Sequence, residues 1–156
     1  MASRLQDEIQ QTRQFACLEQ EAFLNLGRTW AVLEHAFSEG LKPYGITPTQ
    51  YNVLRILRGA GKSGLCRAEV TQRMIAKLPD ATRLLDRLEG SGLIERRRDT
   101  EDRRFVTTRI TDEGLRLLTE LDAPVEALHR EHFGQLEEED LRRLIDLLSR
   151  LRAGVC

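Results

Sequence analysis

The sequence predicts a mainly α-helical protein with one small β-hairpin, and three observations lead to this fold class. Apolar residues recur every three or four positions along both ends of the chain, which is the spacing of an amphipathic helix. Residues 78–111 instead read as a short helix, a glycine turn and two strands joined by an arginine-rich tip. Aromatic residues make up only 5% of the chain and leucine dominates its apolar residues, which favours helices over a β-sandwich.

The central segment, residues 78–111, carries the most specific pattern. Three leucines at helical spacing follow Pro79, and proline suits the first position of a helix because its missing N–H would be unpaired there anyway. Gly90 and Gly92 predict the end of this helix. The run 99–104 is too polar for a core and reads as the tip of a hairpin. A helix followed by a hairpin with a basic tip predicts a winged helix, which points towards DNA.

Upstream of this segment, the pattern predicts four further elements. Residues 4–41 have no proline and a continuous apolar stripe, which predicts a long helix with at most one interruption. Thr47 and Pro48 then provide a cap and a first position for a helix that ends near Gly59. A brief strand is expected at 64–66 and a short helix at 67–77. This short helix and the Pro79 helix together would form a helix–turn–helix.

Two more helices are expected downstream of the hairpin. Thr111 caps the first, with acidic residues placed well for its dipole, and Pro124 should kink it. Acidic residues 137–140 open the last helix, which is rich in leucine. Terminal helices with such apolar stripes cannot be covered by a small winged helix alone, so we expect them to meet a second subunit.

The domain organisation follows from these elements. We expect a single intertwined domain in which residues 1–42 and 112–156 form a helical dimerisation region. Residues 43–111 would form the winged helix-turn-helix DNA-binding region between these two parts.

Charge is segregated along the chain although the formal net charge is only −1. Residues 42–110 hold 15 Lys and Arg against 8 Asp and Glu, whereas residues 111–140 hold 2 against 10. A basic block that coincides with the predicted winged helix favours a nucleic-acid-binding face beside an acidic body.

Composition also excludes several classes of protein. No apolar run approaches the ~18 residues of a membrane span, and the N-terminal residues lack the apolar region of a signal peptide, so a cytoplasmic protein is expected. The three cysteines are widely spaced without a CxxC pair, which argues against a disulfide framework or a zinc ribbon.

Three stretches carry a family resemblance: ITPTQYNVLRIL, TRLLDRLEGSGLIERRRDTEDRRFVTTRITDEG and the leucine-rich last helix. In them the chain resembles the multiple-antibiotic-resistance regulator (MarR) family of bacterial transcription factors, over nearly its whole length. The resemblance implies a two-fold dimer with intertwined terminal helices on a pseudo-palindromic DNA operator. It also implies a repressor that small aromatic or phenolic ligands, or oxidants, release. Arg104 matches the family's wing arginine, and Asp102 matches the acid beside it, which would brace it.

The candidate DNA-binding residues lie on the Pro79 helix, the helix before it, and the wing. Arginine can bond guanine bidentately, and threonine can contact a phosphate or a thymine methyl group. Strand alternation leaves open whether Arg96 and Arg98, or only Arg97, meet phosphate. The candidates are Arg67, Asp80, Thr82, Arg83, Arg87, Arg96, Arg98, Arg103 and Arg104.

An effector pocket, if present, is expected where the long first helix meets the DNA-binding region. By composition alone its candidates are Trp30, His35, Tyr44 and Tyr51. No metal site is predicted, because His129 and His132 lie three apart without an apparent fourth ligand. No cofactor is expected.

Three alternatives remain open. A regulator of the same fold could sense oxidants through Cys17, although the family's reactive cysteine would fall near Phe23. A winged-helix adaptor could bind proteins and never DNA. An enzyme is the weakest alternative, because nothing assembles a nucleophile with a base and an orienting group. The sequence therefore predicts a DNA-binding transcriptional regulator without catalysis.

Overall fold

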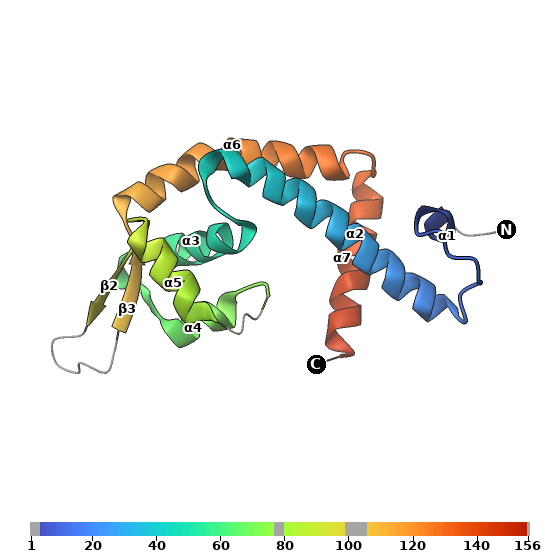
Figure 1. The fold of residues 1–156 in the computed structure, drawn as a ribbon, viewed down its shortest axis with the longest axis horizontal. Helices are drawn as coiled ribbons and strands as arrows, with labels where there is room; N and C mark the ends of the chain where they lie inside the picture. The colour runs from blue at the N-terminus through green and yellow to red at the C-terminus, as the bar shows by residue number, and fades with distance from the viewer. Residues whose placement is uncertain (1–3, 77–79, 99–105, 156) are drawn as a thin grey trace. The chain divides into compact units, whose positions relative to one another are not determined.

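A computed structural model describes residues 4–76, 80–98 and 106–155 of the chain. It is mainly helical with one small sheet, as the sequence predicts (Figure 1). The chain forms two compact units, residues 1–39 and 40–156, each of which is described by itself. Within the described residues, no helix is long and apolar enough to cross a membrane.

The first unit contains a short helix, α1 (Arg4–Glu8), and most of a long one, α2 (Leu18–Leu41). The single interruption that the sequence allows therefore falls between these two helices. Gln10 has a positive φ of 53°, which a right-handed helix cannot accommodate. The side chain of Gln6 then donates a hydrogen bond of 2.9 Å to the carbonyl of Arg13, so the intervening loop closes on α1.

The second unit begins its winged helix with α3 (Pro48–Ala60). Thr47 and Gln50 form a capping box, in which the Thr47 hydroxyl accepts from the Gln50 N–H at 3.2 Å. The Gln50 side chain accepts in turn from the Thr47 N–H at 2.9 Å. The expected start of this helix is therefore confirmed, and Pro48 occupies its first turn.

The helix–turn–helix consists of α4 (Arg67–Arg73) and α5 (Ala81–Gly90). The expected helix over 67–77 was too long, because the backbone is already extended at Met74. The N–H of Ile75 donates to the Asn52 side chain on α3 at 3.1 Å, which replaces a helical hydrogen bond. Residues 77–79, including Pro79, lie outside the described residues.

Three antiparallel strands form the sheet of the winged helix: β1 (Leu65–Cys66), β2 (Ile94–Arg98) and β3 (Val106–Ile110). Their order is β1-β3-β2, and Arg96 lies opposite Thr108 in the register. The brief first strand and the hairpin are confirmed. The glycine turn that precedes the hairpin is confirmed too, since Gly92 has a φ of 73°.

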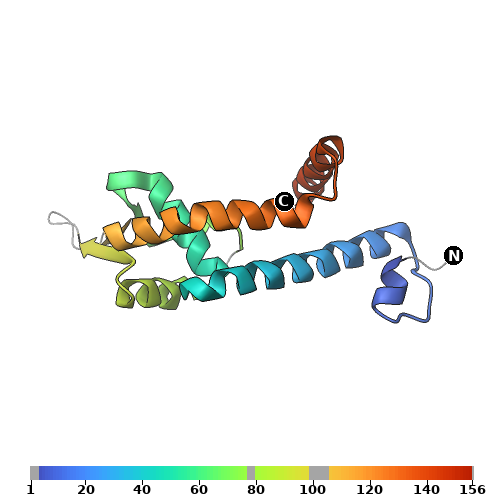
Figure 2. The same cartoon turned by 90° about the horizontal axis from the view of Figure 1, so that it is seen from above.

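Two helices complete the second unit, α6 (Asp112–Phe133) and α7 (Glu138–Ala153). The Thr111 hydroxyl caps α6 by accepting from the Gly114 N–H at 3.2 Å, and α6 continues through Pro124 as one helix. α7 turns sharply away from the axis of α6 (Figures 1 and 2).

The core of the second unit lies where α3, α5 and α6 meet the sheet. It consists largely of leucines that are almost completely removed from solvent: Leu54, Leu57, Leu85, Leu88, Leu118 and Leu121, with Ile94 from β2. The Arg58 guanidinium on α3 forms two hydrogen bonds of 2.9 Å with the Asp122 carboxylate on α6. This packing holds α5 by its apolar side, so its opposite side is free to meet a ligand.

Candidate nucleic-acid interface

The outward side of α5 is the centre of the candidate interface. Leu85 and Leu88 point into the core, whereas Thr82, Arg83, Asp86 and Arg87 are exposed. Arg83 has 80% of its side chain exposed, and Arg87 is exposed one turn further along. Two arginines on one helical face can donate to base edges or to phosphates of a duplex.

Asp80 has a local role that the sequence analysis did not assign. Its side chain caps α5, with one carboxylate oxygen accepting from the Arg83 N–H at 3.1 Å. The other oxygen lies 3.1 Å from Nε of Arg83. Asp80 therefore fixes both the start of the helix and the direction of a candidate DNA-binding arginine.

A hydrogen bond joins the two helices of the helix–turn–helix on the same surface. The Arg67 guanidinium on α4 donates to the Thr82 hydroxyl in the first turn of α5, at 2.9 Å. Both side chains are exposed. The structure thus brings two of the candidate residues, Arg67 and Thr82, into contact on the exposed surface of the helix–turn–helix.

The three arginines of β2 differ in their surroundings. Arg97 pairs with Glu95, at 3.0 Å between Nε and Oε1, on one side of the sheet. Arg96, on the other side, is held by Glu89 and Asp86 of α5. Arg98 is exposed, and the described part of the chain offers it no ion pair. Strand alternation alone therefore did not reveal which arginine is available to a phosphate.

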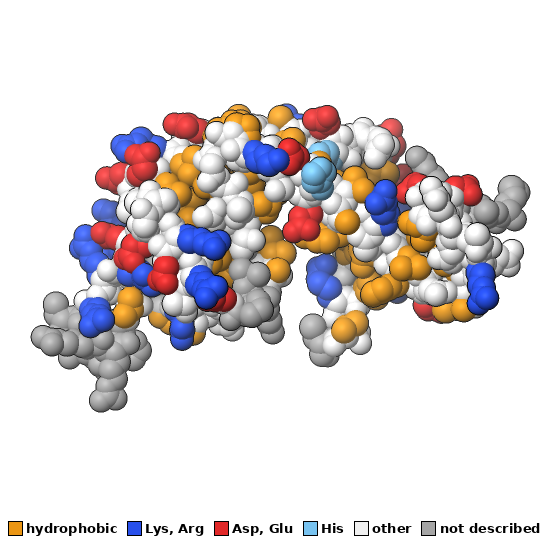
Figure 3. Space-filling view, in the orientation of Figure 1, with side chains coloured by type: hydrophobic (Ala, Val, Ile, Leu, Met, Phe, Trp, Pro, Cys, Tyr) orange, Lys and Arg blue, Asp and Glu red, His pale blue; other side chains and the backbone are white. Residues whose placement is uncertain are grey.

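Arg96 also changes the electrostatics of α5. Hydrogen bonding to the Arg96 guanidinium lowers the pKa of Glu89 below its ordinary value, and the same bond raises the pKa of Arg96. Elsewhere on the winged-helix elements, acidic and basic side chains also lie next to one another (Figure 3). This face therefore carries acidic and basic side chains side by side and is not uniformly basic.

The remaining candidates are spread over the molecule. Asp102, Arg103 and Arg104 of the wing tip lie outside the described residues. The four effector candidates divide between the units, with Trp30 and His35 exposed on α2 and Tyr44 and Tyr51 in the second unit. Tyr51 is buried in the core, where its ring lies 5.9 Å from the Arg55 guanidinium carbon.

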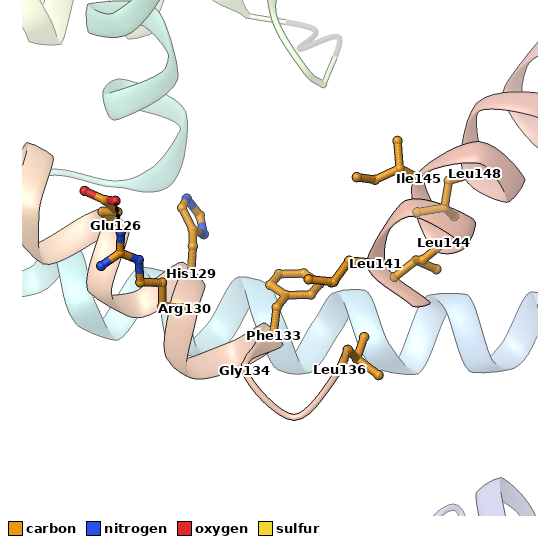
Figure 4. A pocket seen from close by; sticks show the side chains of 10 residues that line it. All are labelled: Glu126, His129, Arg130, Phe133, Gly134, Leu136, Leu141, Leu144, Ile145 and Leu148. Atoms are coloured by element: carbon orange, nitrogen blue, oxygen red, sulfur yellow. Dashed lines mark hydrogen bonds and ion pairs between the residues drawn. The ribbon is translucent and has the colours of Figure 1, made fainter. Parts of the chain in front are cut away.

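An apolar groove that the sequence did not predict lies between α6 and α7. It has a volume of about 600 Å³. Phe133 points towards Leu141, and the apolar side chains of α7 continue the wall (Figure 4). His129 lines this groove. Within residues 4–76, 80–98 and 106–155, no group of three His, Cys, Asp or Glu side chains lies close enough together to hold a metal ion. Its wall residues are Glu126, His129, Arg130, Phe133, Gly134, Leu136, Leu141, Leu144, Ile145 and Leu148.

Comparisons with known proteins agree with this geometry. The family model for the MarR family matches residues 46–106. The chain is 30% identical to the HTH-type transcriptional repressor MdtR of Bacillus subtilis, over 82% of this chain and 81% of the relative. A MarR transcription factor from Planctomyces limnophilus is 38% identical, covering 87% of this chain and 98% of its own, with a TM-score of 0.68. A mutant MarR from E. coli, solved in complex with operator DNA, is 25% identical, covers 96% and 99%, and has a TM-score of 0.77.

Proposed function

Because the chain belongs to the MarR family of DNA-binding transcriptional regulators, we propose that it binds a pseudo-palindromic operator as a homodimer and represses transcription there. The observation that carries this proposal is the exposed, arginine-bearing side of α5 beside the β2–β3 hairpin. The similarity to MdtR, a repressor, supports the sign of regulation.

In this proposal α5 is the recognition helix and enters the major groove. Arg83 and Arg87 would reach base edges or phosphates, with Arg67 and Thr82 on the flanking backbone. The wing would reach the adjacent minor groove, where a narrow groove concentrates negative potential that arginine can meet. Arg98 and the tip residues Arg103 and Arg104 are the candidates for that contact.

The homodimer is supported by apolar surface on α7. Ile145, Leu147 and Leu151 are 66%, 58% and 55% exposed, and α7 has no buried residue. Together with the apolar groove against α6, this surface is larger than single exposed leucines would create, and such surfaces mark interfaces. A second copy with its own leucine-rich helices would cover it. A two-fold dimer also places two recognition helices about one DNA turn (~34 Å) apart.

Release of the operator by a small aromatic or phenolic ligand is the finer part of the proposal. Such a ligand would have to prefer one spacing of the recognition helices over another. A tenfold change in operator affinity requires a coupling free energy of about 1.4 kcal/mol. Trp30, His35, Tyr44 and Tyr51 remain the candidates for ligand contact.

Fluorescence anisotropy with the DNA upstream of the protein's own gene tests the proposal. We expect specific binding whose affinity falls steeply as salt rises, because each phosphate contact releases counterions. Scrambled DNA of the same length is the control for specificity. A winged-helix adaptor that binds only proteins would show no salt-dependent binding to either DNA. Ligand release is then tested by titrating phenolic compounds into the preformed complex.

A further inference from the structure

Arg96 joins two elements that the proposed function brings to DNA. Its Nε donates to Glu89 of α5 at 2.8 Å, and its Nη2 donates both to Glu89 and, at 2.7 Å, to Asp86. The backbone N–H of Arg96 donates to the same Glu89 carboxylate at 3.1 Å. Glu89 therefore binds β2 through the side chain and the main chain of a single residue.

This arrangement differs from the other ion pairs near the interface. Arg83 pairs with Asp80 at the start of its own helix, and Arg97 pairs with Glu95 on its own strand. Neither pair joins two elements. Arg96 is also the least exposed of these arginines, with 27% of its side chain accessible. A phosphate would have to displace two carboxylates to reach its engaged nitrogens.

We propose that Arg96 is a positioning residue: with Glu89 and Asp86 it fastens the wing strand to the recognition helix, so that both meet the duplex in one fixed arrangement. We call these three residues the Arg96 clasp. The proposal rests on the proposed function, because it assigns a role in DNA binding. It replaces the phosphate contact expected of Arg96 from sequence with an indirect role, while Arg98 keeps its place as a candidate contact.

The clasp also has an electrostatic consequence for DNA binding. Asp86 and Glu89 place two negative charges on the helix that would lie against phosphates. Arg96 neutralises one of them and holds both carboxylates towards β2. Without the clasp these carboxylates could turn towards the duplex, where like charges repel.

Glu89→Gln and Glu95→Gln provide a matched test, because each removes one negative charge beside β2. Only Glu89→Gln weakens the clasp, whereas Glu95 lies on the other side of the sheet with Arg97. General electrostatics predicts slightly tighter DNA binding for both variants. The proposal predicts that Glu89→Gln binds the operator about five-fold more weakly, as expected for loss of ~1 kcal/mol. Operator affinity for Glu95→Gln should stay at or above that of the wild type.

A double-mutant cycle with Arg104→Ala separates positioning from direct contact. If the clasp acts by placing the wing, the loss caused by Glu89→Gln, which leaves Asp86 paired with Arg96, should largely disappear once the wing arginine is gone. A direct phosphate contact by Arg96 would instead give additive losses. Additive losses, or a Glu89→Gln variant that binds as tightly as Glu95→Gln, would overturn the proposal. Thermal unfolding of each variant checks that the fold is retained.

A measurement without DNA keeps the clasp and the proposed function distinguishable. Hydrogen exchange of the Arg96 amide should accelerate in Glu89→Ala, which removes the oxygen that accepts from the Arg96 N–H, and not in Glu95→Ala. If the wild type binds no operator, the proposed function fails, and unchanged exchange in Glu89→Ala separately refutes the clasp.

Discussion

The proposed recognition helix α5 and the last helix α7 are both amphipathic, but their apolar sides and charges are covered in different ways. α5 buries Leu85 and Leu88, and the acidic residues of its later turns bind Arg96 on another element. α7 buries no residue, and its ion pairs join neighbouring turns of the same helix. A helix whose apolar side is covered and whose charges reach a neighbour is finished within one chain. α7 has neither feature, which is why we propose that a second copy of the chain covers it.

The largest expected effect is on the free energy of unfolding, when a leucine side chain is truncated on the covered side of α5. Leu88 is fully buried, so Leu88→Ala should lower the free energy of unfolding by about 2–5 kcal/mol through lost burial and the remaining cavity. Urea denaturation followed by circular dichroism measures this. Its neighbour Arg87 is exposed, and Arg87→Ala should change the free energy of unfolding by less than about 0.5 kcal/mol. Equal effects of the two substitutions would contradict the assignment of the two faces.

A substitution on the uncovered side of α7 should change the assembly of the protein and not its fold. Ile145→Glu places a charge on the exposed apolar face, and burying it against a second copy would cost several kcal/mol. We expect sedimentation to show a monomer at concentrations where the wild type is a dimer, with helical circular dichroism retained. Arg150→Ala removes only a local pair with Asp146 and should leave the dimer intact. If the Ile145→Glu variant remained a dimer, the dimer interface would have to lie elsewhere on the protein.

Substitutions on the outward side of α5 should weaken DNA binding and leave stability unchanged. Arg83→Ala and Arg87→Ala should each weaken operator binding by about 1–3 kcal/mol if the arginine meets a base, with little change in thermal stability. Arg142→Ala on α7 removes an equally exposed arginine and serves as the control. Binding that falls equally in all three variants would indicate a general charge effect and not a recognition face.

The smallest effect concerns the acid sensitivity of the ion pairs that join elements. Hydrogen bonding to Arg96 and to Arg58 lowers the pKa of Glu89 and of Asp122, respectively. A carboxylate with a lower pKa in the folded state contributes stability above its ordinary pKa, and this contribution is lost as the pH falls through the folded value. Urea denaturation from pH 7 down to about pH 3 should show a shallower decline for Asp122→Asn than for the wild type. Parallel curves would show that this pair contributes nothing to the pH dependence.

Local signals in the sequence were enough to predict most element boundaries. Thr47 and Thr111 indicate where the helices that they cap begin. The polar run 99–104, followed by a segment rich in β-branched residues, predicts the hairpin. Other boundaries depend on partners distant in sequence. α4 ends early because Asn52 binds the Ile75 N–H, and the break after α1 involves a bond from Gln6 to Arg13. Neither bond alters the apolar periodicity from which helices were predicted.

The candidate site shows the same division. The exposed face of α5 follows from the spacing of its leucines, so Arg83 and Arg87 could be selected from sequence. The partners of Arg96 could not, because the turn through Gly92 must first bring β2 back along α5. The groove between α6 and α7 was missed for a related reason. It depends on the direction in which one helix leaves the other, which periodicity does not encode.

The missing side chain at Gly114 determines how closely α6 packs against the winged helix. An added methyl group there would collide with the carbonyl of Leu93, so the first turn of α6 lies directly on the backbone between α5 and β2. Thr111 strengthens this junction by donating to the carbonyls of Leu93 and Gly92. A tilt of α6 in the assembled protein should therefore move α5 and β2 with it. Gly114→Ala would loosen that connection, and an effector that still released the operator from this variant would have to act by another route.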